Sequence, residues 1–264
     1  MQAGLSYPYS VNINYFLYRR LCRWITCDLR LPHRVELSLS SKHDVASFQD
    51  VFCHPFYWQL FAWMEHPPQL VVDCGANCGH FSVLADTCAR VKFGRSDAHY
   101  VLVEPNPALL PILRRNLEAA GLAGRSRVLG GLLGQKSGSS TLWVQPKNYL
   151  ASSLIPLAGA QRHEVPFIDL KDSIGTSTID VLKVDIEGSE YPFVRDNADV
   201  LVSARLVMME VHAAAAGEQE TMFARLEATG LRPLGKPVCA DGLYLRAWCR
   251  PSAPEGTRIK AGQI

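Results

Sequence analysis

A glycine-rich stretch at residues 73–79 has the residue types of a loop that binds a small ligand, in the order D-x-G-x-x-x-G. The residues that we expect to contact the ligand are Asp73, Gly75, Ala76, Asn77 and Gly79. Glycines let the backbone turn tightly and approach a ligand closely, and a helix that begins after the loop offers unpaired amide donors. Asp73 can accept a hydrogen bond from an ammonium group, whereas a phosphate-binding loop would not favour a carboxylate there. The stretch therefore predicts a ligand that carries an amino group.

A second carboxylate, Glu104, follows a short apolar run and precedes Pro105 and Asn106. A carboxylate at the end of the strand beside such a loop can accept from both hydroxyls of a ribose. The loop and Glu104 together predict a ligand with a ribose and an amino group but no pyrophosphate. This combination argues against a nicotinamide-dependent dehydrogenase, whose glycine loop must present its amides to a pyrophosphate.

Acidic residues and a histidine follow two later apolar runs. Lys183, Asp185 and Glu187 alternate along one run, and Glu210 and His212 end the next. Strand periodicity puts Lys183 and Asp185 on one face of the strand. Since a buried ammonium group is costly unless it is paired, we expect Lys183 to pair with Asp185 and to position it. The carboxyl ends of parallel strands are where ligands bind, so these side chains are expected beside the glycine loop.

This second group suits the removal of a proton from a substrate hydroxyl. His212 has an ordinary pKa near ~6.5, and Asp185 or Glu187 is an alternative base. The group could instead hold Mg²⁺ or Mn²⁺, which would lower the pKa of a substrate diol. The ligands of such a cation would be Asp185, Glu187, Glu210 and His212. The structural alternatives are a histidine hydrogen-bonded at its strand end and, for Glu190, a glutamate favoured by the helix dipole.

The elements that must hold these residues alternate between strands and helices from residue 69 to residue 247. The expected strands, short and apolar as in a parallel sheet, are Leu70–Asp73, Tyr100–Glu104, Arg127–Gly130, Ile179–Asp185 and Arg205–Val211. The expected helices are Phe81–Ala89, Ala108–Ala120, Glu190–Asn197 and Glu218–Thr229. An extra strand at Thr141–Val144 and a final hairpin near Leu231–Leu234 and Gly242–Trp248 complete the pattern. This alternation predicts an α/β fold with a mostly parallel sheet and helices on both faces.

A proline pair at positions 67 and 68 marks a boundary in the chain. Residues 1–66 precede it as an N-terminal extension that we expect to be helical. An amphipathic helix near residues 15–25 would lie on a membrane surface, cover the substrate or pack on the main domain. A short strand over Arg34–Ser40 and apolar helical turns around Pro55 belong to the same extension. Residues 67–250 would form the ligand-binding domain, and residues 251–264 a loose tail.

The composition excludes several classes of protein. The 264 residues include 48% hydrophobic and 20% charged side chains, an ordinary globular balance, and the formal net charge of +2 gives no reason to expect a nucleic-acid partner. The eight cysteines lack the paired spacing of a structural zinc site, so free thiols in a reducing compartment are expected. No stretch reaches the roughly 18 apolar residues of a membrane span and no signal peptide is visible, so the expected location is cytoplasmic.

Five segments together resemble the FkbM family of methyltransferases. The segment LKVDIEGSE at residues 182–190 is similar to the hallmark of that family, as are VDCGANCG at 72–79, VEPNP at 103–107, LGQKSG at 133–138 and EVH at 210–212. The resemblance covers residues 45–247 in the right order. Departures are the insertion-like stretch at residues 91–99 and Leu132, which stands where the family often has alanine and borders the adenine side.

The resemblance implies a Rossmann-like class I methyltransferase fold with a seven-stranded sheet, and S-adenosylmethionine as cofactor. It also implies an O-methyltransferase that acts on a hydroxyl of a sugar, glycan or polyketide-type product. The cofactor contacts predicted in addition to the glycine loop are Phe81, Glu104, Pro105, Asn106, Leu132 and Asp185. The expected partners are a small-molecule or glycan acceptor and, as a homodimer, a second copy of the chain. The remaining alternative is a binding module that has kept the fold without catalysis.

Overall fold

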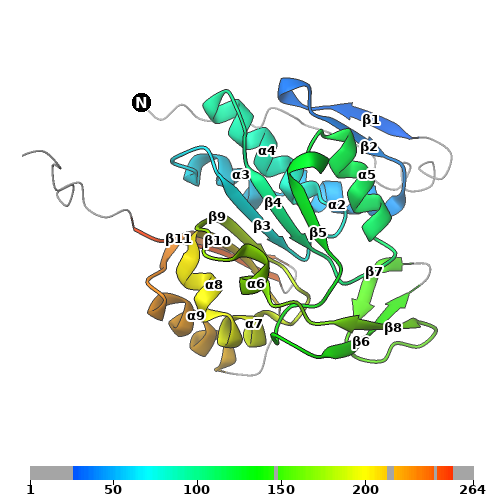
Figure 1. Cartoon of the computed structure of the whole chain (residues 1–264), viewed down its shortest axis with the longest axis vertical. Coiled ribbons are helices and arrows are strands. Elements are labelled where there is room, and N and C mark those ends of the chain that lie inside the picture. The colour runs from blue at the N-terminus through cyan, green and yellow to red at the C-terminus, as the bar shows by residue number, and fades with distance from the viewer. Residues whose placement is uncertain (1–25, 146–147, 213–216, 241–242, 252–264) are drawn as a thin grey trace, which may run out of the picture.

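A seven-stranded sheet forms the centre of the molecule (Figure 1), a computed structural model that describes residues 26–145, 148–212, 217–240 and 243–251. Its strand order is β11-β12-β10-β9-β3-β4-β5. The strands are β3 (Leu70–Cys74), β4 (His99–Val103), β5 (Ser126–Leu129), β9 (Ile179–Val184), β10 (Ala204–Val211), β11 (Arg232–Ala240) and β12 (Leu243–Cys249). Neighbours from β10 to β5 pair in parallel, whereas β12 is antiparallel to both β10 and β11. The predicted α/β fold with a mostly parallel sheet is confirmed, with the predicted final hairpin as its antiparallel part.

Helices cover both faces of this sheet (Figure 1). One face carries α2 (Lys42–Phe52), α3 (Pro55–Trp63), α4 (His80–Phe93) and α5 (Leu110–Ala119). The other face carries α6 (Leu170–Ile174), α7 (Glu190–Asp196), α8 (Ala198–Ser203) and α9 (Glu218–Ala228). Short 3₁₀ turns lie at Pro32–Arg34 and Ala123–Arg125. Each face has its own buried apolar cluster, because side chains of the parallel strands point alternately to opposite faces.

The described part of the N-terminal extension is not purely helical. It begins with a hairpin of β1 (Cys27–Arg30) and β2 (Glu36–Leu39), so the predicted strand over residues 34–40 is confirmed within two residues. Pro55 begins α3, where a proline needs no backbone donor. The apolar side chains of this region share one buried cluster with those of β3 and α4. The expected helix near residues 15–25 and the tail from residue 252 lie outside the described residues.

A second, three-stranded sheet lies beside the first (Figure 1). It consists of β6 (Ser139–Gln145), β7 (Asn148–Ser153) and β8 (Gln161–Pro166) in the order β7-β6-β8. The strand expected over residues 141–144 is the middle of β6, whereas β7 and β8 were not predicted as strands. A parallel bridge between Leu132 and Phe167 joins this sheet to the chain after β5.

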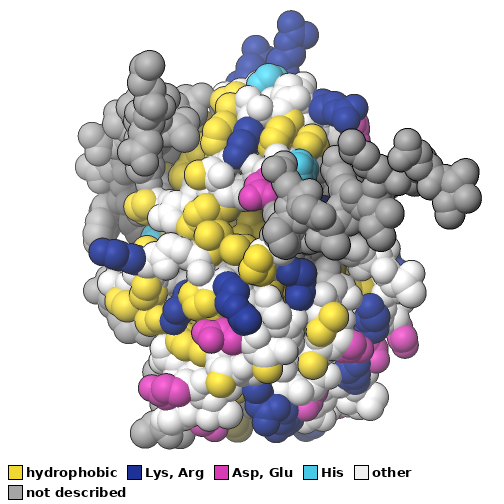
Figure 2. All heavy atoms as spheres, turned by 90° about the vertical axis from the view of Figure 1, so that its left-hand side faces the viewer, with side chains coloured by type: hydrophobic (Ala, Val, Ile, Leu, Met, Phe, Trp, Pro, Cys, Tyr) yellow, Lys and Arg dark blue, Asp and Glu magenta, His cyan; other side chains and the backbone are white. Residues whose placement is uncertain are grey.

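The face of the molecule at the left-hand side of Figure 1 is mixed in character. Figure 2 shows hydrophobic side chains gathered in the middle of this face, with Lys, Arg, Asp and Glu side chains scattered around them. Both signs of charge are interspersed there, so this view shows no continuous basic strip of the kind that nucleic acids bind. In the described part of the chain, every helix is too short or too polar to cross a membrane.

Candidate active site

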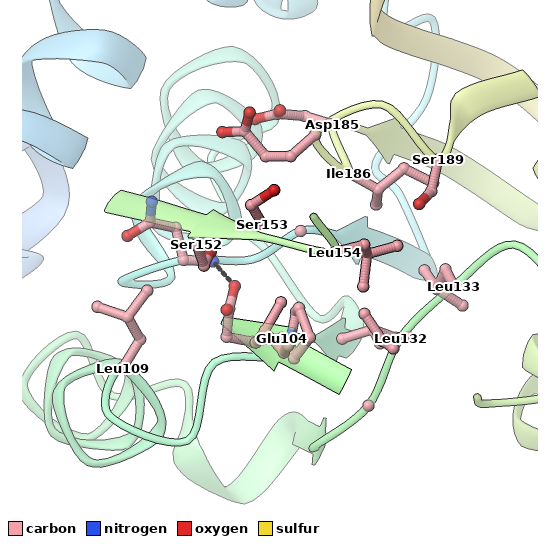
Figure 3. A pocket seen from close by; sticks show the side chains of 17 residues that line it. Glu104, Leu109, Leu132, Leu133, Ser152, Ser153, Leu154, Asp185, Ile186 and Ser189 are labelled. Atoms are coloured by element: carbon pink, nitrogen blue, oxygen red, sulfur yellow. Dashed lines mark hydrogen bonds between the residues drawn. The ribbon is translucent and has the colours of Figure 1, made fainter. Parts of the chain in front are cut away.

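A pocket opens at the carboxyl ends of β3, β4 and β9, where open parallel sheets bind their ligands (Figure 3). The side chains and backbone that line it are Gly75, Asn77, Val103, Glu104, Pro105, Leu109, Gly131, Leu132, Leu133, Leu142, Ser152, Ser153, Leu154, Asp185, Ile186, Glu187 and Ser189. In Figure 3, Glu104 and Asp185 lie on opposite sides of the pocket, and the β7 residues lie between them. One side of the pocket is apolar, and its polar groups are few and convergent, as in pockets for small ligands.

The glycine loop approaches β9 so closely that only glycine fits at its first position. A Cβ atom added to Gly75 would lie 1.6 Å from the carbonyl oxygen of Asp185, and φ of Gly75 is +76°. The amides of Gly75 and Ala76 both donate to the carbonyl of Val103, at 2.9 Å each, which ties the loop to β4. Asn77 adopts φ +50°, a left-handed conformation that asparagine tolerates better than most residues.

Glu104 is held in place by the loop and by the turn that follows β4. Its carboxylate accepts from the amide of Asn77 at 2.7 Å and from the amide of Asn106 at 2.8 Å. Burial raises the pKa of Glu104 to about 7, although the two amides favour the ionised form. The side-chain oxygen of Asn77, also on the pocket wall, is buried without a hydrogen-bond partner among the described residues. A ligand that donates hydrogen bonds fits this pair of acceptors.

Lys183 is buried beneath the loop and makes the predicted ion pair. Its ammonium group lies 3.1 Å from Asp185 Oδ2 and 3.5 Å from Asp73 Oδ1, and it donates to the carbonyl of Gly75 at 2.6 Å. Burial lowers the pKa of Lys183, but the carboxylates of Asp185 and Asp73 outweigh burial and raise it above its ordinary value. The lysine therefore holds Asp185 in place, and it also forms an ion pair with Asp73 that the sequence did not predict.

The structure places five of the predicted cofactor contacts behind the pocket wall. Asp73 is fully buried between Lys183 and Ser82, so its carboxylate does not face the pocket as expected. The side chain of Phe81 packs edge-on against Tyr57 in the core, 5.8 Å between ring centroids. Three others serve the backbone of the loops rather than line the pocket: Ala76, Gly79 and Asn106. Gly75, Asn77, Glu104, Pro105, Leu132 and Asp185 do line it.

His212 lies among carboxylates at the end of β10. Its Nδ1 is 3.0 Å from Glu190 Oε1, and its Nε2 is 3.2 Å from Glu187 Oε2 and 3.7 Å from Glu210 Oε1. Hydrogen bonds to Glu187 and Glu190 raise the pKa of His212 to about 11, against the opposing effect of burial. The imidazole is therefore protonated at neutral pH with both nitrogens occupied, which disfavours the predicted role of His212 as the base.

Glu190 does more than complement the helix dipole. The residue is fully buried, and its Oε1 accepts from the amides of Ile186 and Gly188, at 3.2 and 3.1 Å, as well as binding His212. It thereby fixes the turn that contains Glu187, whose φ is +54°. His212 is thus hydrogen-bonded at its strand end, as one of the alternatives expected, and Glu190 is its partner.

Glu210 lies near the residues that could bind a metal ion. Glu210 lies within 3.5 Å of the Tyr57 hydroxyl, which donates to it, and burial followed by the charge of Asp185 raises its pKa to about 7. Asp185, Glu187 and His212 bring one ligand atom each to within 4.8 Å of one another, and Glu210 is not part of that set. The described residues thus offer three of the four predicted metal ligands at cation-binding separations.

Ser152 and Ser153 are polar enough in the sequence to be expected either as contacts of an acceptor or cofactor or as part of a solvated loop, and both line the pocket. Ser152, Ser153 and Leu154 come from β7 and its end, and Leu133 and Leu142 extend the apolar wall around Leu132. Leu142 and Leu154 were not predicted as pocket residues, because β6 and β7 lie outside the alternation of strands and helices that forms the main sheet. The neighbouring polar residues of β8, Arg162 and His163, are not among the lining residues.

This chain is similar to known methyltransferases. The model of the methyltransferase FkbM domain matches residues 73–230, more than half of the chain. Among solved structures, methyltransferase FkbM from Methylobacillus flagellatus KT is 17% identical with a TM-score of 0.49, and the match covers 78% of this chain and 52% of that one. Precorrin-6y C5,15-methyltransferase from Geobacter metallireducens GS-15 is 11% identical with a TM-score of 0.44, over 73% and 87% of the two chains.

A third solved structure, Aeropyrum pernix fibrillarin in complex with natively bound S-adenosyl-L-methionine, is 11% identical with a TM-score of 0.42, over 69% of this chain and 66% of that one. No curated protein matches the chain. The sheet order and the loop at its carboxyl edge are those of a Rossmann-like methyltransferase that uses S-adenosylmethionine. Within that class, the chain belongs to the FkbM methyltransferase domain family.

Proposed function

We propose that this chain is an O-methyltransferase that transfers the methyl group of S-adenosylmethionine to a hydroxyl of a sugar, glycan or polyketide-type product. The observation that carries the proposal is that two carboxylates line one pocket from opposite sides. Glu104 can accept hydrogen bonds from a ribose, and Asp185 can act as a base. Lys183 holds Asp185 at the pocket wall in addition to supporting the loop, which favours a catalytic role for Asp185 over a catalytically silent binding module.

Glu104 and Asn77 are the residues that we assign to the nucleoside. Glu104 is already aligned by two amides, and its carboxylate can accept from ribose hydroxyls, while the unpartnered oxygen of Asn77 accepts from the same ligand. Leu132, Leu133 and Leu142 offer an apolar wall for the adenine. S-adenosylmethionine, when bound, supplies a methyl carbon that its sulfonium charge activates, so the protein mainly aligns the two reactants.

Asp185 is the residue that we assign as the general base. It lines the pocket, and Lys183 holds one of its oxygens, Oδ2, so that the other is assigned to the acceptor. As the acceptor oxygen gains the methyl group, Asp185 takes the proton that the hydroxyl loses. His212 is assigned to orientation of Glu187, because its own ring nitrogens are both engaged.

A second candidate role for the cluster is metal binding, which the close approach of Asp185, Glu187 and His212 favours. Oxygen-rich sites of this kind suit Mg²⁺ or Mn²⁺, which would bind a diol acceptor and lower the pKa of its hydroxyls. A metal there would displace the proton on His212 Nε2 that faces Glu187. The cytoplasmic location, the absence of a nucleic-acid acceptor and the homodimer remain predictions.

The test is a screen of hydroxylated acceptors for methyl transfer, with wild-type protein, Asp185→Asn and His212→Gln, each with added magnesium and with a chelator. We expect a product methylated on oxygen, turnover lowered at least a hundredfold in Asp185→Asn, and a smaller loss in His212→Gln. Methylation on carbon or nitrogen only would reject the O-methyltransferase. Loss of activity with the chelator, restored by magnesium, would favour the metal role.

A further inference from the structure

A buried polar network connects the N-terminal extension to the glycine loop. Its centre is Asp44, a fully buried residue of α2 whose carboxylate binds side chains of α5. Asn116 donates to Asp44 Oδ1 at 3.0 Å, and Arg115 reaches both carboxylate oxygens at 2.9 and 2.8 Å. The hydroxyl of Ser41, the N-cap of α2, donates to Oδ2 at 2.9 Å. All these partners donate to one carboxylate, so the charge is fully compensated.

Asn116 connects Asp44 to the glycine loop. It is itself fully buried, and its side-chain nitrogen also donates to the carbonyl of Cys78 at 2.9 Å. A carboxamide nitrogen has two protons, so one goes to Asp44 and one to Cys78. The third contact of this nitrogen, to His80 Nε2, is the longest at 3.5 Å. Asp44 therefore sets the rotation of the carboxamide that binds the loop.

The backbone of the loop is left-handed on both sides of the carbonyl that Asn116 binds. Cys78 lies between Asn77, with φ +50°, and Gly79, with φ +83°. A left-handed residue other than glycine persists only where its surroundings hold it. The amide of Asn77 is the donor that aligns Glu104, at 2.7 Å. The carbonyl that Asn116 binds is thus one residue away from the amide that orients the acceptor assigned to the ribose.

A second contact supports the same connection. The ring of His80, the first residue of α4, is buried, with Nδ1 3.0 Å from the hydroxyl of Ser47 in α2. Phe48 of α2 packs edge-on against the same ring, with centroids 6.0 Å apart. Burial lowers the pKa of His80 to about 4, so the ring is neutral at physiological pH. Helix α2 therefore contacts the loop through Cys78, by way of Asn116, and through the first turn of α4.

We propose that Asp44 is a positioning residue for the S-adenosylmethionine loop and acts through Asn116 on the carbonyl of Cys78. The proposal rests on the proposed function, because it assumes that Glu104 binds the cofactor. It assigns the described part of the N-terminal extension a role in cofactor binding. Loss of the connection lets residues 77–79 relax, and the amide of Asn77 then no longer aligns Glu104.

The first test compares the affinity for S-adenosylmethionine, by calorimetry, of wild-type protein, Asp44→Asn and Asn116→Leu. The matched control is Val45→Ala, which removes buried apolar atoms from the same helix without touching the network. We expect Kd to rise about tenfold in the two network variants, equivalent to about 1.4 kcal/mol, and to stay within twofold in the control. Hydrogen exchange at amides 75–79 should be faster in the network variants only. Unchanged Kd and unchanged loop exchange in both would overturn the proposal.

The second test uses the wild-type protein alone, so it holds even if the variants do not fold. Coupling is reciprocal, so S-adenosylmethionine should slow hydrogen exchange in α2, at residues 42–48, more than in α9 on the other face of the sheet. Equal slowing in α2 and α9 would contradict the connection. If the wild-type protein binds no S-adenosylmethionine, the proposed function fails, while loop exchange in the variants still decides whether Asp44 supports the loop.

Discussion

The pH dependence of cofactor affinity is the prediction that follows most directly from the state of Glu104. Burial raises the pKa of this carboxyl from 4.5 to about 7, a difference that corresponds to about 3 kcal/mol between its two protonation states. Ribose hydroxyls donate hydrogen bonds, so the ligand needs the ionised carboxylate. Below pH 7 the free protein holds a proton that binding must expel. The affinity for S-adenosylmethionine should therefore be about tenfold weaker at pH 6 than at pH 8.

Glu104→Gln is the matched perturbation. The variant keeps the shape of the side chain but cannot ionise, so its affinity at pH 8 should fall by about 10- to 100-fold, the value of one charge-assisted hydrogen bond. Its affinity should also lose most of the pH dependence between pH 6 and pH 8. The assay is calorimetric titration at both pH values. Titration of the ligand itself is common to both proteins and cancels in the comparison.

Glu210→Gln serves as the control, because the pKa of Glu210 is also raised to about 7 by burial, yet this residue does not line the pocket. We expect this variant to keep the pH dependence of the wild-type protein. The reasoning is refuted if Glu104→Gln shows the same change of affinity with pH as the wild-type protein. The stability of the free protein gives a second readout. A raised pKa in the folded state stabilises the fold at low pH, and this stabilisation is lost as the pH rises from 4.5 through 7.

Three further predictions concern the groups around Glu104. Gly75→Ala adds a Cβ atom 1.6 Å from the carbonyl oxygen of Asp185 and should lower the free energy of unfolding, measured by urea denaturation, by about 3 kcal/mol. The control is Gly124→Ala, whose Cβ meets nothing within 4 Å and which should change that free energy by less than about 0.5 kcal/mol. Lys183→Met leaves the carboxylates of Asp73 and Asp185 without their cation and should lower the free energy of unfolding by about 3–5 kcal/mol. Adding Asp73→Asn should restore part of this loss. A stability of Lys183→Met equal to that of the wild-type protein would contradict the ion pair. Because the pKa of His212 is raised from 6.5 to about 11, the folded protein keeps a proton that the unfolded chain loses as the pH rises. The free energy of unfolding of the wild-type protein should therefore fall between pH 7 and pH 10, and that of His212→Gln should fall less. Parallel curves for the two proteins would reject the raised pKa.

The sequence predicted the main sheet and its helices well because their signals are local. Helix α5 was expected at residues 108–120 and spans Leu110–Ala119, and α9 was expected at 218–229 and spans Glu218–Ala228. Gly121 and Gly230 end these helices with φ +69° and +90°, as a left-handed cap predicts. The second sheet was largely missed, because its strands pair antiparallel over β6 outside the alternation of the main sheet, and its small apolar cluster draws on only a few residues, among them Leu142, Val144 and Val165.

The sequence predicted several of the residues that line the candidate site, but not how deeply each side chain is buried. Asp185, Glu104 and Asn77 line the pocket, because the end of a parallel strand is a reliable guide to position. Asp73 sits at such an end too, but its side chain points under the loop, where Lys183 is buried. Spacing along a strand gives the face on which a side chain lies and not its depth. The role of Glu190 was underestimated because its partners, His212 and two amides, come from other segments.

The central claim is that the pocket between Glu104 and Asp185 holds S-adenosylmethionine. Its most direct test is calorimetric titration of that ligand into the wild-type protein and into Glu104→Ala at pH 8, with the thermal stability of both proteins checked beforehand. We predict saturable binding at one site in the wild-type protein and an affinity lowered at least tenfold in the folded variant. Equal affinity in the two proteins would contradict the claim.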